Sequence, residues 1–457
     1  MRDFQASPKP LRILAALIVL LTVFIASAQQ PGADGVGDRL YPQLGNGGYD
    51  VEHYDISLRF TPEENHISAR TVIEATATED LRSFNLDLYG LTVERVNVNG
   101  AIASFERDDS EFIITPATSL AAGASFAVAV DYAGVPSPIA DPGVSFVKLG
   151  WQAWEDAYFG AVSEPSGAMN WFPSNNHPSD KASYTMRITV PDGLTAAANG
   201  VLTEVTANQD ATRTIIWEMS DPMASYLTIV AVGDFVEFRD DSGPVPIRNY
   251  FPAGLDADIV SGFDVTQEIM SWLIDLIGPY PFSEYGVVVL PGFPAALETQ
   301  TLSAFGAEEP DPIVIVHELV HQWFGNSVSP ARWQDIWLNE GFATFFMALY
   351  LEEIEDHQGM ELLLSVAQAD LPPPGDIEVS ELFGPSVYFR GALTLNALRA
   401  RVGDDTFFNI LREYYQRHAH SVVTTEDLIA VAEDVSGRDL GEFFDAWLYR
   451  EEMPDGP

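Results

Sequence analysis

The most informative segment of the chain is His317-Glu318-Leu319-Val320-His321, in which two histidines stand four residues apart around a glutamate. On a helix, residues i and i+4 lie on one face about 5–6 Å apart at Cβ, so both imidazoles can reach one ion. The carboxylate of Glu318 would lie beside that ion, where it can take a proton from an attacking water. Asp311-Pro312 is a good helix start. The sequence therefore predicts a metal-binding helix that begins near residue 312.

A third ligand follows in Trp337-Leu338-Asn339-Glu340-Gly341-Phe342-Ala343, after 18 intervening residues. This segment also has helical patterning, and two antiparallel helices would bring Glu340 to His317 and His321. Three protein ligands and a water are typical of a catalytic zinc site rather than a structural one. The alternative is that Glu340 forms a surface ion pair and the histidines are satisfied in the core. An acidic residue within so apolar a stretch is costly without a partner, which favours the metal site.

Hydrophobic periodicity around these motifs predicts two domains. Before residue 238, apolar residues alternate with polar ones, and turn signals such as Asn99-Gly100 and Asn199-Gly200 separate the runs. After it the period lengthens, as in the predicted helix over 257–277, which Gly278-Pro279 ends. We therefore expect an all-β N-terminal domain over 46–238 and a mainly α, α+β catalytic domain over 239–452.

Taken together, these motifs resemble the M1 family of zinc aminopeptidases, which are gluzincins with a thermolysin-like catalytic domain. The histidine motif and the Glu340 segment carry the resemblance most strongly, and Tyr49 to Asp55 resembles the first strand of the family's β domain. Ala224 to Phe235 resembles the end of that domain, and Ser436 to Trp447 resembles the end of the catalytic domain. The resemblance covers about residues 45 to 450 and implies a short form without the helical C-terminal domain of larger members.

The resemblance implies roles for three further residues. Glu298, in Ala295-Ala296-Leu297-Glu298-Thr299, matches the glutamate that binds the substrate's α-ammonium in the family's Gly-x-Met-Glu-Asn motif. Ala295, Leu297 and Thr299 depart from that motif, so side-chain preference is expected to differ. Glu164 resembles the second amine-binding acid, contributed by the β domain, and an exposed loop glutamate is its alternative. Tyr388 resembles the tyrosine that stabilises the tetrahedral oxyanion, and a buried core tyrosine is its alternative.

The N-terminus has the pattern of a secretory signal peptide. Positive residues precede an apolar run from Ile13 to Ile25, which ends in the small residues Ala26-Ser27-Ala28. We expect cleavage after residue 28 and a flexible leader over 29–45. The alternative is a retained membrane anchor, for which the apolar run is short against the roughly 20 residues that a bilayer core needs. The mature protein is then expected to be secreted, periplasmic or extracellular.

Composition narrows the partners of the protein. The 457 residues include 67 acidic and 23 basic ones, a formal charge of −44, and no cysteine. This charge would repel nucleic acid and anionic membranes, and the absence of cysteine excludes a thiolate zinc site and disulfides. The sequence gives no indication of the oligomeric state.

The remaining histidines show no ligand spacing and are expected at the surface or as caps. Asp335 is either support for a ligand histidine or a helix N-terminal acid.

We therefore expect a zinc aminopeptidase that acts on peptides and holds one Zn²⁺ per chain. Its predicted ligands are His317, His321 and Glu340, and its general base is Glu318. A zinc metallo-endopeptidase is the nearer alternative, favoured if Glu164 or Glu298 does not reach the site. A non-catalytic peptide-binding protein of the same fold is the more distant one.

Overall fold

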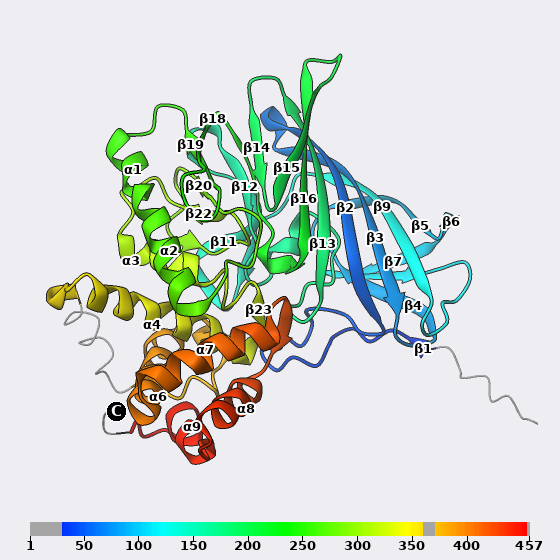
Figure 1. Ribbon diagram of the computed structural model, residues 1–457. Helices are drawn as coiled ribbons and strands as arrows, with labels where there is room; N and C mark the ends of the chain where they lie inside the picture. The colour runs from blue at the N-terminus through cyan, green and yellow to red at the C-terminus, as the bar shows by residue number, and fades with distance from the viewer. Residues whose placement is uncertain (1–29, 360–370, 455–457) are drawn as a thin grey trace, which may run out of the picture.

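The computed structural model describes residues 30–359 and 371–454. The predicted signal peptide, residues 1–28, lies outside the described residues. Strands make up most of the first half of the described chain, and helices make up most of the second half (Figure 1). The predicted fold class, a β-rich domain followed by a mainly helical catalytic domain, is confirmed.

The largest sheet among the described residues is built from the strands whose alternation the sequence displays. In β2, the side chains of Tyr54, Ile56, Leu58 and Phe60 are buried, because alternate residues of a strand point to the same face. β13 lies parallel to β2 although the two are far apart in sequence, and Tyr184 pairs with Tyr54. The strands of this sheet, in spatial order, are β15 (Val201–Ala207), β16 (Thr212–Ala224), β13 (Lys181–Pro191), β2 (Tyr49–Thr61), β3 (His66–Ala77), β9 (Ser125–Gly134), β5 (Thr92–Val98) and β6 (Ala101–Ile102).

Two smaller sheets complete the N-terminal region. One has the order β1 (Gln30–Pro31), β4 (Leu81–Asp87), β8 (Glu111–Thr115) and β7 (Ser104–Asp108). The other has the order β10 (Ile139–Asp141), β11 (Val144–Ala153), β12 (Phe159–Val162), β17 (Val230–Gly233) and β14 (Thr195–Ala198). The antiparallel pair β11 and β12 is the part of this region that reaches the functional site, because Glu164 follows β12 directly.

A further mixed sheet begins at the expected domain boundary. Its order is β18 (Phe235–Asp240), β19 (Ile247–Pro252), β20 (Val287–Val289), β22 (Ser303–Phe305) and β21 (Ala296–Leu297). β18 spans residue 238 and pairs antiparallel with β19, so this strand belongs to the sheet that follows the boundary. The division at residue 238 stays a prediction.

Most of the helices lie below this sheet in Figure 1, and the first two lie beside it. The predicted helix over 257–277 is broken by a 3₁₀ turn at Phe263–Val265, and it ends at Gly278, where φ is 129°. Thr424 and Asp427 form a capping box at the start of α8. The α-helices of the described residues are α1 (Ala257–Gly262), α2 (Thr266–Ile277), α3 (Pro312–Val320), α4 (Trp337–Glu353), α6 (Gly391–Val402), α7 (Asp404–His418), α8 (Thr425–Ser436) and α9 (Gly441–Leu448). The short strands β23 (Val328–Pro330) and β24 (Ser421–Val423) pair with each other in this half of the chain.

The segment before β2 differs from the flexible leader that the sequence suggested. Leu40, Tyr41 and Leu44 are buried, and so is the carboxylate of Asp38. These side chains find partners that lie far along the chain, which a local pattern does not show. In the described part of the chain, no helix is long and apolar enough to cross a membrane.

Candidate metal centre and active site

α3 presents the histidine motif to the interior. Its first turn is fixed by Asp311, whose side chain accepts a hydrogen bond from the backbone N–H of Ile313, and by Pro312 at the first helical position. His317 lies in the last turn, and His321 immediately follows the helix. The centroids of their rings are 4.7 Å apart, so both imidazoles can reach a single metal ion.

Glu340, in the first turn of α4, meets both histidines. Its Oε2 lies 3.2 Å from Nε2 of His317 and 3.5 Å from Nε2 of His321. Two ligands held about 2.0–2.1 Å from a tetrahedral zinc would be about 3.3–3.4 Å apart. The donor set and its spacing therefore fit zinc, and the three ligand atoms all lie within 4.8 Å of one another.

A close contact between α4 and α6 sets the position of the next functional segment. A Cβ built on Gly341 would lie 3.0 Å from Cα of Gly391, closer than real Cβ atoms are normally found. Glycine at both positions therefore allows the two helices to approach at the residue that follows Glu340. This contact brings the segment before α6, which contains Tyr388, to the metal ligands.

Tyr388 lies in a single π-helical turn, Ser386–Arg390, which leads into α6. Turns of this kind are frequent at functional sites. The ring of Tyr388 is nearly parallel to that of His317, with 5.9 Å between centroids and 12° between planes. Arg390 fixes the end of the turn, because its buried guanidinium donates to the carbonyls of Leu371 and Trp447. The sequence does not show this role of Arg390, since both carbonyls are distant along the chain.

Glu298 follows β21, the edge strand of its sheet. Its backbone carbonyl accepts hydrogen bonds from the side chains of Gln322, at 3.1 Å, and Asn326, at 2.6 Å. Both residues come shortly after His321, so the end of the histidine motif also holds the Glu298 loop. Sequence inspection missed these two residues, because residue type and spacing do not reveal which carbonyl an amide side chain contacts.

Glu164 reaches the same pocket from the β-rich half of the chain. Its carboxyl faces the same pocket as that of Glu298. Only about 5% of Glu164 and 4% of Glu298 is exposed to solvent, so Glu164 is not an exposed loop glutamate. The two acids come from segments far apart in sequence and converge beside the histidines.

These residues line one pocket with a cavity volume of about 280 Å³. Four buried carboxylates, those of Glu164, Glu298, Glu318 and Glu340, face it. Among the described residues that line the pocket there is no lysine or arginine. Burying this much negative charge is costly unless cations balance it. The remaining lining residues are mostly apolar: Val144, Phe146, Val147, Leu149, Val162, Phe293, Ala295, Ala296, Leu297, Val314 and Phe383.

The crowding of acids shifts the pKa values of the site. Burial and the negative charge of Glu298 raise the pKa of Glu318 well above its usual range. Burial and neighbouring acids likewise raise the pKa of Glu164. Burial opposes ionisation of Glu340 as well, but the charge of His321 and hydrogen bonds from both imidazoles outweigh it and lower its pKa to about 2. Glu340 is therefore the carboxylate that stays ionised beside the histidines.

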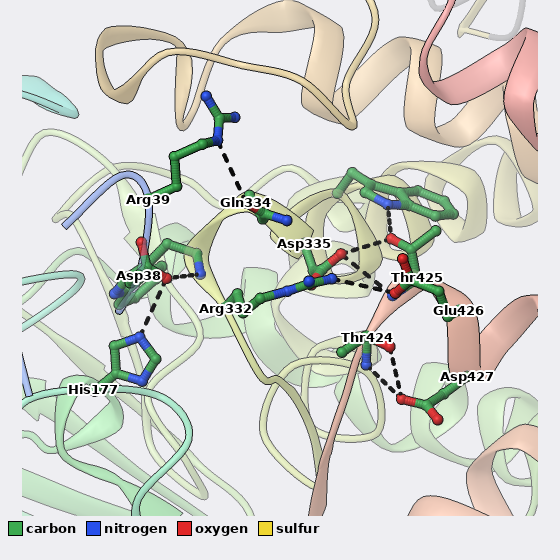
Figure 2. A network of polar contacts seen from close by, with 12 residues as sticks. Asp38, Arg39, His177, Arg332, Gln334, Asp335, Thr424, Thr425, Glu426 and Asp427 are labelled. Carbon is green, nitrogen blue, oxygen red and sulfur yellow. Dashed lines mark hydrogen bonds and ion pairs between the residues drawn. The ribbon is translucent and has the colours of Figure 1, made fainter. Parts of the chain in front are cut away.

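Two further expectations from the sequence are settled by contacts shown in Figure 2. Asp335 does not support a ligand histidine: its carboxylate accepts from the hydroxyl of Thr425 at 2.8 Å and pairs with Arg332 at 2.8 Å. The expectation that His177 lies at the surface or caps a helix is wrong, because 2% of it is exposed and its Nε2 lies 3.2 Å from Asp38.

Comparison with known proteins places these features in a family. Residues 50–227 match the model of the peptidase M1 N-terminal domain, and residues 262–447 match that of the peptidase family M1 domain. A crystal structure of an M1 zinc metallopeptidase from Deinococcus radiodurans superposes with a TM-score of 0.86 at 33% identity, over 93% of this chain and 98% of that one.

Named relatives in sequence include aminopeptidase M1-C from Oryza sativa subsp. japonica, 30% identical over 324 residues, and aminopeptidase N from Streptomyces lividans, 29% identical over 335 residues. Both alignments cover 64% of this chain, but 37% and 38% of the two relatives respectively. The aligned region thus spans well under half the length of these relatives.

The fold and the matched family models define a metallopeptidase: a β-rich domain joined to a helical domain that contains the histidine motif. The chain belongs to peptidase family M1. Zinc is the metal that the family implies.

Proposed function

We propose that this chain is a zinc-dependent aminopeptidase, which removes the first residue of a peptide. The observation that carries the proposal is that four buried carboxylates surround one pocket. The described residues that line this pocket include no lysine or arginine to balance their charge. A metal ion at one end of the set and the α-ammonium of a substrate at the other would supply the missing positive charge. An endopeptidase needs no acids for an ammonium group, so the pair of Glu164 and Glu298 favours an aminopeptidase.

In this proposal His317, His321 and Glu340 hold one zinc ion per chain. When bound there, zinc would supply Lewis-acid activation of water and of the scissile carbonyl. Glu318, with its raised pKa, accepts the proton of the attacking water and then donates it to the leaving amine. The hydroxyl of Tyr388 stays protonated, because burial and the surrounding acids raise its pKa, and it donates to the carbonyl oxygen as that atom gains negative charge.

Glu164 and Glu298 bind the free α-ammonium and so fix which peptide bond reaches the base. Charge-assisted hydrogen bonds of this kind contribute about 1.5–3 kcal/mol each. A variant of the Deinococcus radiodurans metallopeptidase has been crystallised with a Tyr-Ser-Ala substrate, and its fold matches this chain with a TM-score of 0.86. Binding of a short peptide in the related fold supports the same substrate class here.

The Glu298→Ala variant should lose most of the preference for a free N-terminus. The assay compares kcat/KM for a fluorogenic leucine substrate with kcat/KM for its N-acetylated form, leucine being chosen because the pocket walls are mostly apolar. Removing one carboxylate should reduce the preference of the parent by about 10-fold or more, since one charge-assisted bond is lost. Glu308→Ala, at an exposed glutamate, is the matched control. A Glu298→Ala variant with the full preference of the parent would remove Glu298 from amine binding.

We further propose that residues 1–28 act as a cleaved signal peptide, so that the mature protein is exported. The apolar run Ile13 to Ile25, which ends in Ala26-Ser27-Ala28, supports this. N-terminal sequencing of the exported protein should begin at Gln29. A mature chain that still starts at Met1 would instead support a retained anchor.

A further inference from the structure

The segment before β2 bridges the two halves of the molecule. It runs from the sheets of the N-terminal region towards the helices (Figure 1). Asp38 is 4% exposed, and its carboxylate accepts hydrogen bonds from the backbone N–H of Leu40, at 2.7 Å, and of Trp333, at 2.8 Å. Trp333 lies just before α4. His177, whose Nε2 lies 3.2 Å from the same carboxylate (Figure 2), belongs to the β-rich region. Asp38 therefore joins three parts of the fold.

Charged groups hold this segment in contact with both halves of the molecule. Burial opposes ionisation of Asp38, but the hydrogen bond from His177 and those from backbone N–H groups outweigh it and lower its pKa to about 2. Asp38 thus remains a charged acceptor at neutral pH. Arg39 adds a second link to the catalytic half, because its guanidinium donates to the carbonyl of Ile377 at 2.7 Å and lies 3.3 Å from Asp376.

Tyr41 connects this segment to the residues that support Glu164. Its hydroxyl donates to Oδ1 of Asp141 at 2.6 Å, and its ring packs edge-on against Trp333. Burial and the negative charge of Asp141 raise the pKa of Tyr41, so the hydroxyl stays protonated and remains a donor. The other carboxylate oxygen of Asp141 accepts a hydrogen bond from the hydroxyl of Ser166.

Ser166 belongs to the turn that carries Glu164. This turn is closed by a hydrogen bond from the N–H of Gly167 to the carbonyl of Ser163, at 2.7 Å. Holding the side chain of Ser166 therefore restrains the backbone of Glu164, two residues earlier. Asp141 ends β10, which pairs with β11, the strand that supplies Val144 and Leu149 to the pocket wall.

We propose that Tyr41, Asp141 and Ser166 are positioning residues that hold Glu164 at the distance from Glu298 needed to bind the α-ammonium of the substrate. The proposal rests on the proposed aminopeptidase function. The described residues that line the pocket do not include Tyr41, Asp141 or Ser166. These three residues therefore act through Glu164 rather than on the substrate. A segment that the sequence suggested to be a flexible leader thereby becomes part of the substrate-binding apparatus.

Two substitutions test this relay without enlarging any side chain: Tyr41→Phe, which keeps the ring and removes the hydroxyl, and Ser166→Ala. Because amine binding acts equally on bound substrate and transition state, misplacing Glu164 should raise KM and leave kcat nearly unchanged. We expect KM for a free leucine substrate to rise about 3- to 10-fold in either variant, the effect of one hydrogen bond. Kinetics on the N-acetylated substrate, which has no ammonium group, should not change.

Tyr49→Phe is the matched control, since Tyr49 is also buried and its hydroxyl also makes a hydrogen bond, to the carbonyl of Asn85 at 2.7 Å, away from the pocket. Parent-like KM values in Tyr41→Phe and Ser166→Ala would overturn the relay, even if Tm falls, because the contacts would then be purely structural. If the parent cuts free and acetylated substrates equally well, the amine clamp itself fails. The two failures are thus distinguished by the behaviour of the parent.

Discussion

Replacing Glu318 with glutamine is expected to lower kcat by about 10³- to 10⁴-fold, the upper part of the range for a positioned acid–base group. Glutamine keeps the size and shape of the side chain but cannot accept a proton from water or return one to the leaving amine. Glu318 serves both steps in the proposed mechanism, so both are lost together. Zinc content should remain that of the parent, because Glu318 is not among the three residues whose ligand atoms converge.

The control for this variant is Glu340→Ala, which removes a proposed ligand instead of the base. It should lose both zinc and activity. Metal analysis of the two variants therefore distinguishes a carboxylate that binds zinc from one that acts as the general base. Turnover within a few-fold of the parent in Glu318→Gln would exclude Glu318 as the base. Full zinc occupancy in Glu340→Ala would exclude Glu340 as a ligand.

Replacing Tyr388 with phenylalanine is expected to lower kcat by about 10²- to 10³-fold, the usual effect of removing one oxyanion donor. The ring that lies parallel to His317 is retained, so the metal site should keep its shape. KM should change little, because the hydroxyl acts mainly on charge that develops in the transition state.

Tyr415→Phe is a suitable control for Tyr388→Phe, since the hydroxyl of Tyr415 bonds to the carbonyl of Pro279 and Tyr415 does not line the pocket. It should behave as the parent in both kinetic constants. If kcat of Tyr388→Phe equals that of this control, Tyr388 is a core residue and the oxyanion must be stabilised by another group.

Local patterns were sufficient to predict much of the fold. Alternation of apolar and polar residues, as in Tyr54 to Phe60, predicted the strands, and Asp311-Pro312 predicted the start of a helix that the structure contains. These features depend on neighbours within a few residues. The parallel pairing of β13 with β2 depends on the whole sheet, and no local pattern indicated it.

The contacts that the sequence did not predict all join distant segments. His177 was expected at the surface because its partner, Asp38, stands 139 residues away in a segment without periodicity. Asp335 was left between two roles, and it does not support a ligand histidine, since it bonds to Thr425, 90 residues further on. The candidate site itself was predicted more fully, because spacing within two helices indicates His317, His321 and Glu340. Resemblance to a family was the only basis for assigning roles to Glu164, Glu298 and Tyr388.

The central claim, that this chain is an aminopeptidase, is tested most directly by comparing the parent enzyme on free and N-acetylated forms of one leucine substrate. A free α-amine has a pKa near 8 and is mostly charged at neutral pH, whereas acetylation leaves a neutral amide facing Glu164 and Glu298. We predict that acetylation lowers kcat/KM at least about 100-fold, a difference of about 2.7 kcal/mol. Equal kcat/KM values for the two forms would contradict the account and favour a metallo-endopeptidase.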